Sequence, residues 1–98
     1  MTLTRTSTYL DAEGAQLFTQ RTIDANRVRI SEWLSHDSSP RIAVTAFFHG
    51  ETTGRMLPLG MLYAGRGPIE VSGTCVVLTR APERPNGFSI HSTYPIES

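Results

Sequence analysis

The sequence contains no lysine, a single cysteine and no long hydrophobic run, and each absence excludes a class of protein. Cys75 alone cannot form an internal disulfide or a multi-cysteine zinc site, and its apolar neighbours predict a buried packing residue. No segment is apolar enough to span a bilayer, and the start of the chain does not have the pattern of an export signal. We therefore expect no membrane contact and no secretion signal within the chain itself.

The chain also lacks net charge, because its nine arginines are balanced by nine acidic residues. Bulk charge therefore does not demand a polyanionic partner. A length of 98 residues predicts one domain spanning residues 1–98. The three histidines are far apart and have no ligand spacing, and no dinucleotide or phosphate-loop motif is present. We expect no metal and no cofactor, which leaves acid–base chemistry by His, Tyr, Ser, Thr and Arg side chains.

The hydrophobic pattern divides the chain into a helical first third and a β-rich remainder. Residues 2–9 are predicted to be extended. One helix, or two helices with a joint near residues 21–22, begins after the capping residue Asp11 and continues to about residue 34. Residues 41–48 are apolar enough to predict a central strand, residues 65–67 a turn, and residues 73–80 and 88–94 a hairpin that ends at Pro95. The predicted class is α+β, with a helix or helix pair packed on a small antiparallel sheet.

The last predicted strand carries an unusual density of polar side chains. Regular alternation puts Ser92 and Tyr94 on one face with Phe88 and Ile90, and His91 on the other face with Ser89 and Thr93. Ser92 and Tyr94 can then converge on one ligand, which His91 can join only across a bulge or a bend. The alternative is an edge strand whose hydroxyl groups face water. Residues of these types suit RNA cleavage, in which a base activates the ribose 2′-hydroxyl and an acid protonates the leaving oxygen.

Four segments together resemble one bacterial toxin family: residues 7–11 (STYLD), 25–34 (ANRVRISEWL), 76–80 (VVLTR) and 92–95 (STYP). It is the RNase A-like domain at the C-terminus of contact-dependent growth inhibition proteins and other polymorphic toxins. The resemblance covers nearly the whole chain and implies an RNase A-like fold without disulfides. It also implies a toxin that cleaves RNA without a metal in the bacterial cytoplasm, that is secreted only as part of a larger protein, and that binds an immunity protein.

The resemblance also implies a site. The family's closing strand carries a Thr-x-Tyr-Pro motif with active-site hydroxyls, which residues 92–95 match with serine in place of threonine. We expect catalytic roles for Tyr94, Ser92 and His91, and substrate contacts from Thr93, Arg80 and His49.

One departure from the family divides the functional hypotheses. The family's catalytic histidine and arginine belong to a helix before the segment matched by residues 7–11, and only six residues precede that segment here. The domain is therefore predicted to be truncated at its N-terminus. Either His91 or His49 replaces the missing histidine, or the intact toxin supplies the helix, or the chain is an inactive remnant that binds RNA or a partner protein. A homodimer that covers the apolar area left by the helix is a further expectation.

Overall fold

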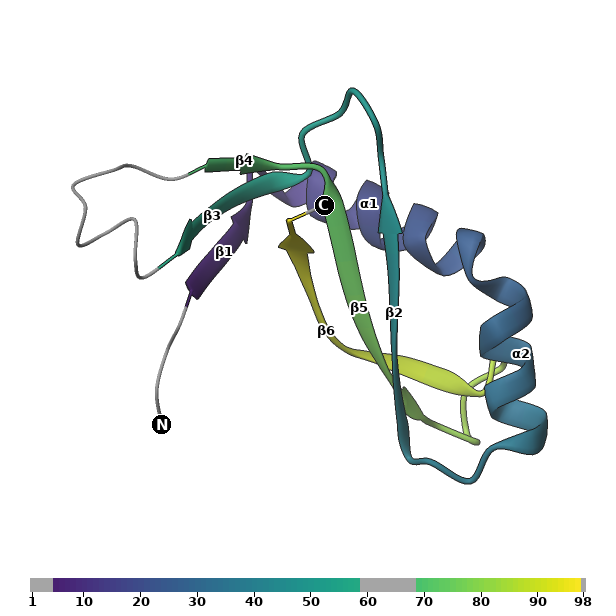
Figure 1. Cartoon of the computed structure of the whole chain (residues 1–98). Helices are drawn as coiled ribbons and strands as arrows, with labels where there is room; N and C mark the ends of the chain where they lie inside the picture. The colour runs from purple at the N-terminus through teal and green to yellow at the C-terminus, as the bar shows by residue number, and fades with distance from the viewer. Residues whose placement is uncertain (1–4, 59–68, 98) are drawn as a thin grey trace.

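The computed structural model describes residues 5–58 and 69–97, and these residues form two helices and six strands (Figure 1). The predicted α+β class is confirmed. The elements in chain order are β1 (Arg5–Tyr9), α1 (Ala12–Ala25), α2 (Arg27–His36), β2 (Arg41–Phe47), β3 (Gly54–Pro58), β4 (Ile69–Val71), β5 (Gly73–Arg80) and β6 (Phe88–Ile96). The turn predicted at residues 65–67 lies outside the described residues.

The helices begin as the sequence predicts but divide at a different residue. The carboxylate of Asp11 accepts a hydrogen bond of 2.6 Å from the backbone N–H of Gly14 and caps α1. The break falls at Asn26 rather than at residues 21–22. Asn26 donates through Nδ2 to the carbonyls of Thr22 and Thr45, at 2.8 and 2.9 Å. Its side chain therefore joins the helix break to β2, a tertiary contact that hydrophobic periodicity does not reveal.

The strands form two antiparallel sheets, with the orders β1-β3-β4 and β2-β5-β6. β5 is the central strand of the second sheet, so the prediction of a central strand at residues 41–48 is wrong. β2 lies at the edge, and its burial alternates: Val44 is buried, while Arg41, Ala43, Thr45 and Phe47 are exposed. Small apolar residues on both faces of a strand do not distinguish an edge from a centre, because Ala is compatible with both.

β6 also continues past Pro95 to Ile96, contrary to the expectation that the proline ends the strand. Pro95 lies opposite Thr74 of β5. Two backbone hydrogen bonds, from Phe48 N to Ser72 O and from Arg80 N to Pro40 O, fix the pattern between β2 and β5. In this pattern the N–H and C=O groups of even-numbered β5 residues, such as Thr74, point toward β2 and away from β6. Pro95 therefore sits where β6 has no hydrogen bond to β5, and its missing N–H leaves no gap in the ladder.

The hydrophobic core lies between the helices and one face of the β2-β5-β6 sheet, which we call the inner face (Figure 1). Its buried members are Ile23, Ile30, Trp33, Val44, Val76 and Leu78. Phe88 and Leu34 pack against this cluster from the hairpin and from α2. The opposite face, which we call the outer face, is not covered by either helix.

The two sheets meet where the end of β6 packs against β3. Gly54 allows this approach, because a Cβ atom at this position would lie 2.6 Å from Cγ of Pro95 and 2.3 Å from the carbonyl oxygen of Thr8. Pro95 is fully buried there. No described helix is long and apolar enough to cross a membrane.

Candidate functional site

β6 contains a β-bulge at His91. Ser92 lies opposite Val77 of β5 and Ile90 lies opposite Leu78, so neighbouring β5 residues face β6 residues that are two apart. His91 is the extra residue of the bulge, and its side chain is exposed. Alternation alone required a bulge or a bend for His91 to join Ser92 and Tyr94, and the bulge lies at His91 itself.

The bulge changes which residues of β6 share a face. Residues directly opposite each other in an antiparallel pair lie on the same face. Ile90 and Thr93 lie opposite Leu78 and Val76, which belong to the core, so both face the helices. The predicted grouping of Phe88 and Ile90 with Ser92 and Tyr94 is therefore wrong. Regular alternation assumes an uninterrupted strand, and the extra residue reverses its phase.

Ser92 and Tyr94 do share a face, as predicted, and it is the outer face. They lie opposite Val77 and Cys75, which alternate with the core residues of β5. Tyr94 is 38% exposed and Ser92 is half-buried. Because Thr45 of β2 also pairs with Cys75, a third hydroxyl lies in the same cross-strand row as Tyr94. Sequence reasoning missed Thr45, because its place in the row depends on the pairing of β2 with β5.

Thr93 lies on the inner face, away from Ser92 and Tyr94. Its hydroxyl oxygen is 2.6 Å from the hydroxyl of Tyr9 and 2.7 Å from that of Thr19. These distances are typical of O–H···O hydrogen bonds. The structure therefore does not bring Thr93 to the face that holds the two expected catalytic hydroxyls.

Arg80 is also directed into the protein. Its guanidinium group lies over the Trp33 ring, 5.0 Å from the ring centre. Nε and Nη1 donate to the carbonyls of Ser39 and Leu34 at 2.9 and 3.2 Å, and Nη2 donates to those of Trp33, at 2.5 Å, and Asp37. An arginine has five N–H groups, so these bonds use most of its donors on the C-terminal end of α2 and the loop that follows. We call this arrangement the Arg80 clamp.

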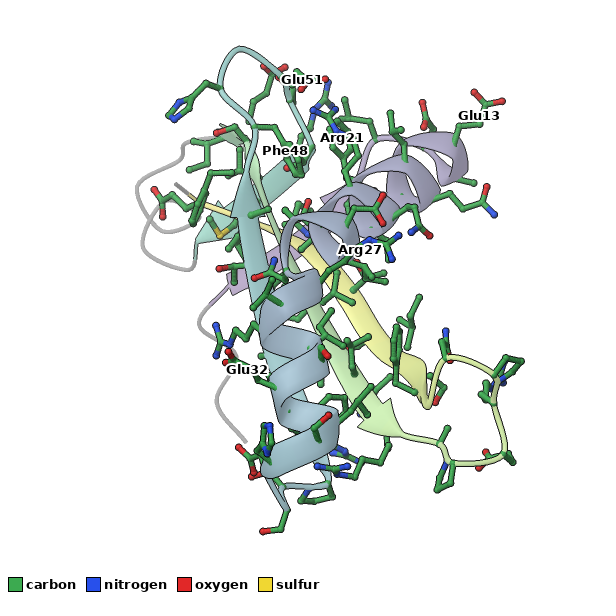
Figure 2. The ribbon with its side chains drawn as sticks, turned by 90° about the vertical axis from the view of Figure 1, so that its right-hand side faces the viewer. Glu13, Arg21, Arg27, Glu32, Phe48 and Glu51 are labelled. Atoms are coloured by element: carbon green, nitrogen blue, oxygen red, sulfur yellow. The ribbon has the colours of Figure 1, made fainter. Side chains whose placement is uncertain are left out.

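His49 is exposed in the loop after β2, on a segment that is fastened to α1 (Figure 2). Both guanidinium Nη atoms of Arg21 donate to the Glu51 carboxylate at 2.9 Å. The same guanidinium lies 4.5 Å from the centre of the Phe48 ring. The hydrogen bonds from Arg21 hold the pKa of Glu51 below its usual value. No described hydrogen bond or ion pair joins His49 to Ser92, Tyr94 or His91.

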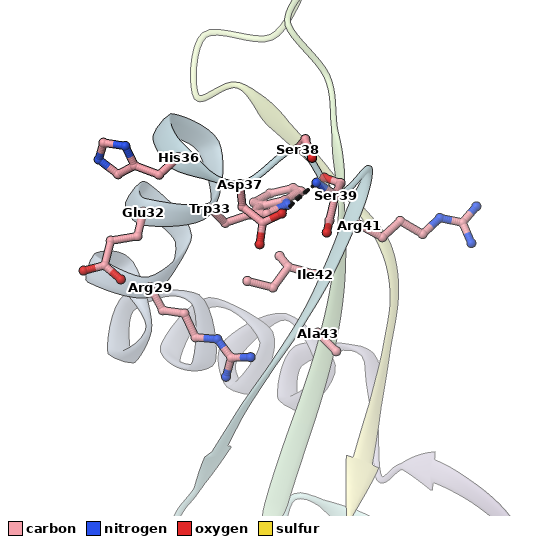
Figure 3. A pocket seen from close by; sticks show the side chains of 10 residues that line it. All are labelled: Arg29, Glu32, Trp33, His36, Asp37, Ser38, Ser39, Arg41, Ile42 and Ala43. Atoms are coloured by element: carbon pink, nitrogen blue, oxygen red, sulfur yellow. Dashed lines mark hydrogen bonds between the residues drawn. The ribbon is translucent and has the colours of Figure 1, made fainter.

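A hollow of about 790 Å³ lies between α2 and the exposed edge of β2 (Figure 3). Arg29, Glu32 and His36 line it from α2, and Arg41 extends from the β2 side away from α2. Asp37, at its rim, accepts a hydrogen bond of 2.7 Å from the backbone N–H of Ser39, which lowers the pKa of that carboxyl group. The charged side chains of mixed sign are exposed, and none of the predicted site residues lines this hollow. The described residues contain no cluster of three His, Cys, Asp or Glu side chains that could hold a metal ion.

The sequence of residues 1–95 matches the model of the bacterial CdiA-CT RNase A domain family. The chain belongs to this family. A chain in the crystal structure of the CdiA-CT/CdiI complex from Y. kristensenii 33638 has a similar fold, with a TM-score of 0.87 and 21% sequence identity. The match covers 98% of this chain and 80% of that chain. No curated protein matches this chain. The family membership confirms the resemblance to contact-dependent growth inhibition toxins and the RNase A-like fold.

Proposed function

We propose that this CdiA-CT RNase A domain cleaves RNA at the outer face of β6, with Tyr94, Ser92 and His91 as the reacting or phosphate-contacting groups. The observation that supports this most directly is the register of β6. It places the two hydroxyl residues of the Ser-Thr-Tyr-Pro segment together on the face that neither of the two described helices covers, with an exposed histidine at the adjoining bulge. β-Bulges recur next to active sites, where they redirect a side chain.

The proposed reaction is transfer of the phosphodiester within the RNA chain. The ribose 2′-oxygen forms a bond to phosphorus as the bond from phosphorus to the 5′-oxygen breaks, leaving a 2′,3′-cyclic phosphate and a free 5′-hydroxyl. The imidazole of His91 takes the 2′-hydroxyl proton, and the hydroxyl of Tyr94 gives a proton to the leaving oxygen. The hydroxyl of Ser92 donates to a non-bridging phosphate oxygen as charge develops there. This chemistry needs no metal ion.

Cleavage of tRNA or single-stranded RNA in excess chelator tests the proposal, with detection of 2′,3′-cyclic phosphate ends. Tyr94→Phe and His91→Ala should each lower the rate by about 10²–10⁴-fold, the usual contribution of a general acid or base. Ser89→Ala is the matched control on the same strand and face, and His36→Ala is the control for loss of an exposed histidine. Equal rates in all four variants and wild type would rule out the site.

Deletion of His91 provides a second test. Ile90 and Ser92 already pair with consecutive β5 residues, so removing the bulge residue leaves both halves of β6 in register. We expect this variant to fold and to lose cleavage as His91→Ala does. Full activity in both variants would show that the proton acceptor lies elsewhere.

We also propose that a cognate immunity protein binds this domain, because the similar solved structure is a CdiA-CT/CdiI complex. The domain would then be delivered as part of a larger secreted protein and act in the cytoplasm of the target bacterium. A competing function is an inactive RNA-binding or protein-interaction module. Binding of RNA without any cyclic phosphate product would favour that module over the enzyme.

A further inference from the structure

The Thr93 hydroxyl connects β6 with two elements near the start of the chain. It bonds to Tyr9 at the end of β1 and to Thr19 in α1, across 84 and 74 residues respectively. Thr19 is buried, whereas Tyr9 and Thr93 are half-buried. We call this group of three side chains the hydroxyl cluster. Its two hydrogen bonds join the β1-β3-β4 sheet and α1 to β6.

The cluster lies behind the proposed site. Thr93 is between Ser92 and Tyr94 in the chain, and its side chain points to the opposite face of the strand. A displacement of Thr93 therefore moves both neighbours. β6 is an edge strand that pairs only with β5 in its sheet, and its ladder is interrupted at His91, two residues before Thr93. A slip of one residue would exchange the two faces of the strand. The contacts that hold Thr93 on the inner face therefore also hold Ser92 and Tyr94 on the outer face.

The proton count of the Thr93 hydroxyl limits how the two hydrogen bonds can be arranged. Thr93 has one hydroxyl proton, so it donates to one partner and accepts from the other, or accepts from both. Replacing Thr93 with valine keeps the shape of the side chain but removes both bonds. The hydroxyl of Thr19 then remains in a buried position without its partner, which disfavours the native placement of β6.

We propose that Thr93 is a positioning residue, which holds Ser92 and Tyr94 in their reactive placement through the hydroxyl cluster and does not contact RNA. This inference rests on the proposed function for its catalytic consequence. It replaces the expectation from the sequence that Thr93 binds substrate. Tyr9 and Thr19 act in the same way, by fixing the hydroxyl of Thr93 from β1 and α1.

The first experiment compares the cleavage kinetics of Thr93→Val, Thr93→Ser and Thr22→Val. Thr22 is a fully buried threonine whose hydroxyl donates to the Phe18 carbonyl at 2.7 Å within α1, so it controls for the loss of a buried hydroxyl. Thr93→Val should lower kcat by about 10–100-fold with KM changed less than about threefold, as expected for misplaced catalytic groups. Thr93→Ser keeps the hydroxyl and should remain within about threefold of wild type.

A double-mutant cycle tests the mechanism. If Tyr9 acts through Thr93, Tyr9→Phe should lower kcat in the wild-type background and have little further effect in Thr93→Val. Independent, multiplicative effects would overturn the proposed connection. So would a kcat within twofold of wild type in Thr93→Val, or equal losses of kcat in Thr93→Val and Thr22→Val at temperatures where both are folded.

A second measurement does not depend on turnover. Hydrogen exchange of the Ser92 and Tyr94 amides should accelerate about tenfold or more in Thr93→Val, and not in Thr22→Val. If the wild-type protein does not cleave RNA, the proposed function fails, and this measurement still decides whether Thr93 holds the strand. Unchanged exchange at both amides would overturn the positioning role.

Discussion

The Arg80 clamp makes a quantitative prediction about stability. Arg80→Met keeps an unbranched apolar side chain but removes the guanidinium that donates to four backbone carbonyls and lies over Trp33. A hydrogen bond from a charged donor contributes about 1.5–3 kcal/mol. Since Arg80 is half-buried and water can reach some of the released carbonyls, we use about 1 kcal/mol for each bond. The four bonds and a small cation–π contribution together give a loss of about 4–5 kcal/mol.

Urea denaturation followed by circular dichroism measures this loss. The unfolding midpoint should fall with little change in the m-value, and Tm should drop by roughly 16 °C or more for a domain of this size. Arg27→Met is the matched control, because Arg27 forms an exposed ion pair with Asp24 at 2.7 Å. Such a pair is worth about 0.5 kcal/mol or less. Arg80→Lys should recover only part of the loss, since an ammonium group cannot reach carbonyls so widely spread.

The clamp would be refuted by an Arg80→Met protein within about 0.5 kcal/mol of wild type, the range of an ordinary surface substitution. The same variants also test the expectation from the sequence that Arg80 binds substrate. If the Arg80 guanidinium bound a phosphate, its removal would reduce the slope of log K for RNA binding against log salt concentration by about one unit. An internal clamp predicts no change in that slope for Arg80→Met, which removes the charge, measured at a temperature where the variant is folded.

Two further predictions concern the loop after β2, which Arg21 holds against α1, and the junction of the two sheets. Because hydrogen bonds from Arg21 lower the pKa of Glu51 in the folded state, the stability they contribute is present at neutral pH and is lost as pH falls through that lowered pKa. The difference in unfolding free energy between wild type and Glu51→Gln should therefore shrink toward acid pH, whereas a constant difference would contradict the pairing. Gly54→Ala should destabilise by about 2 kcal/mol or more, because its Cβ would meet the Thr8 carbonyl and Pro95. Gly50→Ala, with φ of +79° and open space around it, should cost only about 1 kcal/mol by thermal denaturation.

Local signals in the sequence were enough to predict most of the elements. Asp11 before an amphipathic segment predicted the start of α1, and the apolar run around Cys75 predicted the buried strand that became β5. These features depend on residues within a few positions of each other, so a single sequence contains the information that specifies them.

The features that the sequence did not predict depend on contacts between distant residues. The break at Asn26 is fixed by its bond to Thr45, and the direction of the Arg80 side chain is fixed by carbonyls more than forty residues earlier in the chain. An arginine that holds the end of a helix and an arginine that binds phosphate look identical in a sequence. Only the position of the donors relative to the carbonyls separates these roles.

The bulge at His91 shows why the placement of the site needed the structure. Phe88 must face the helices to pack on the core, and Thr93 must face them to reach Tyr9 and Thr19. Thr93 is five positions after Phe88, so regular alternation would place the two residues on opposite faces. A bulge that absorbs one residue satisfies both requirements, and it leaves Ser92 and Tyr94 on the outer face. The packing of the inner face thus determines that the two hydroxyl residues point away from the core, and the core and the proposed site specify the same register.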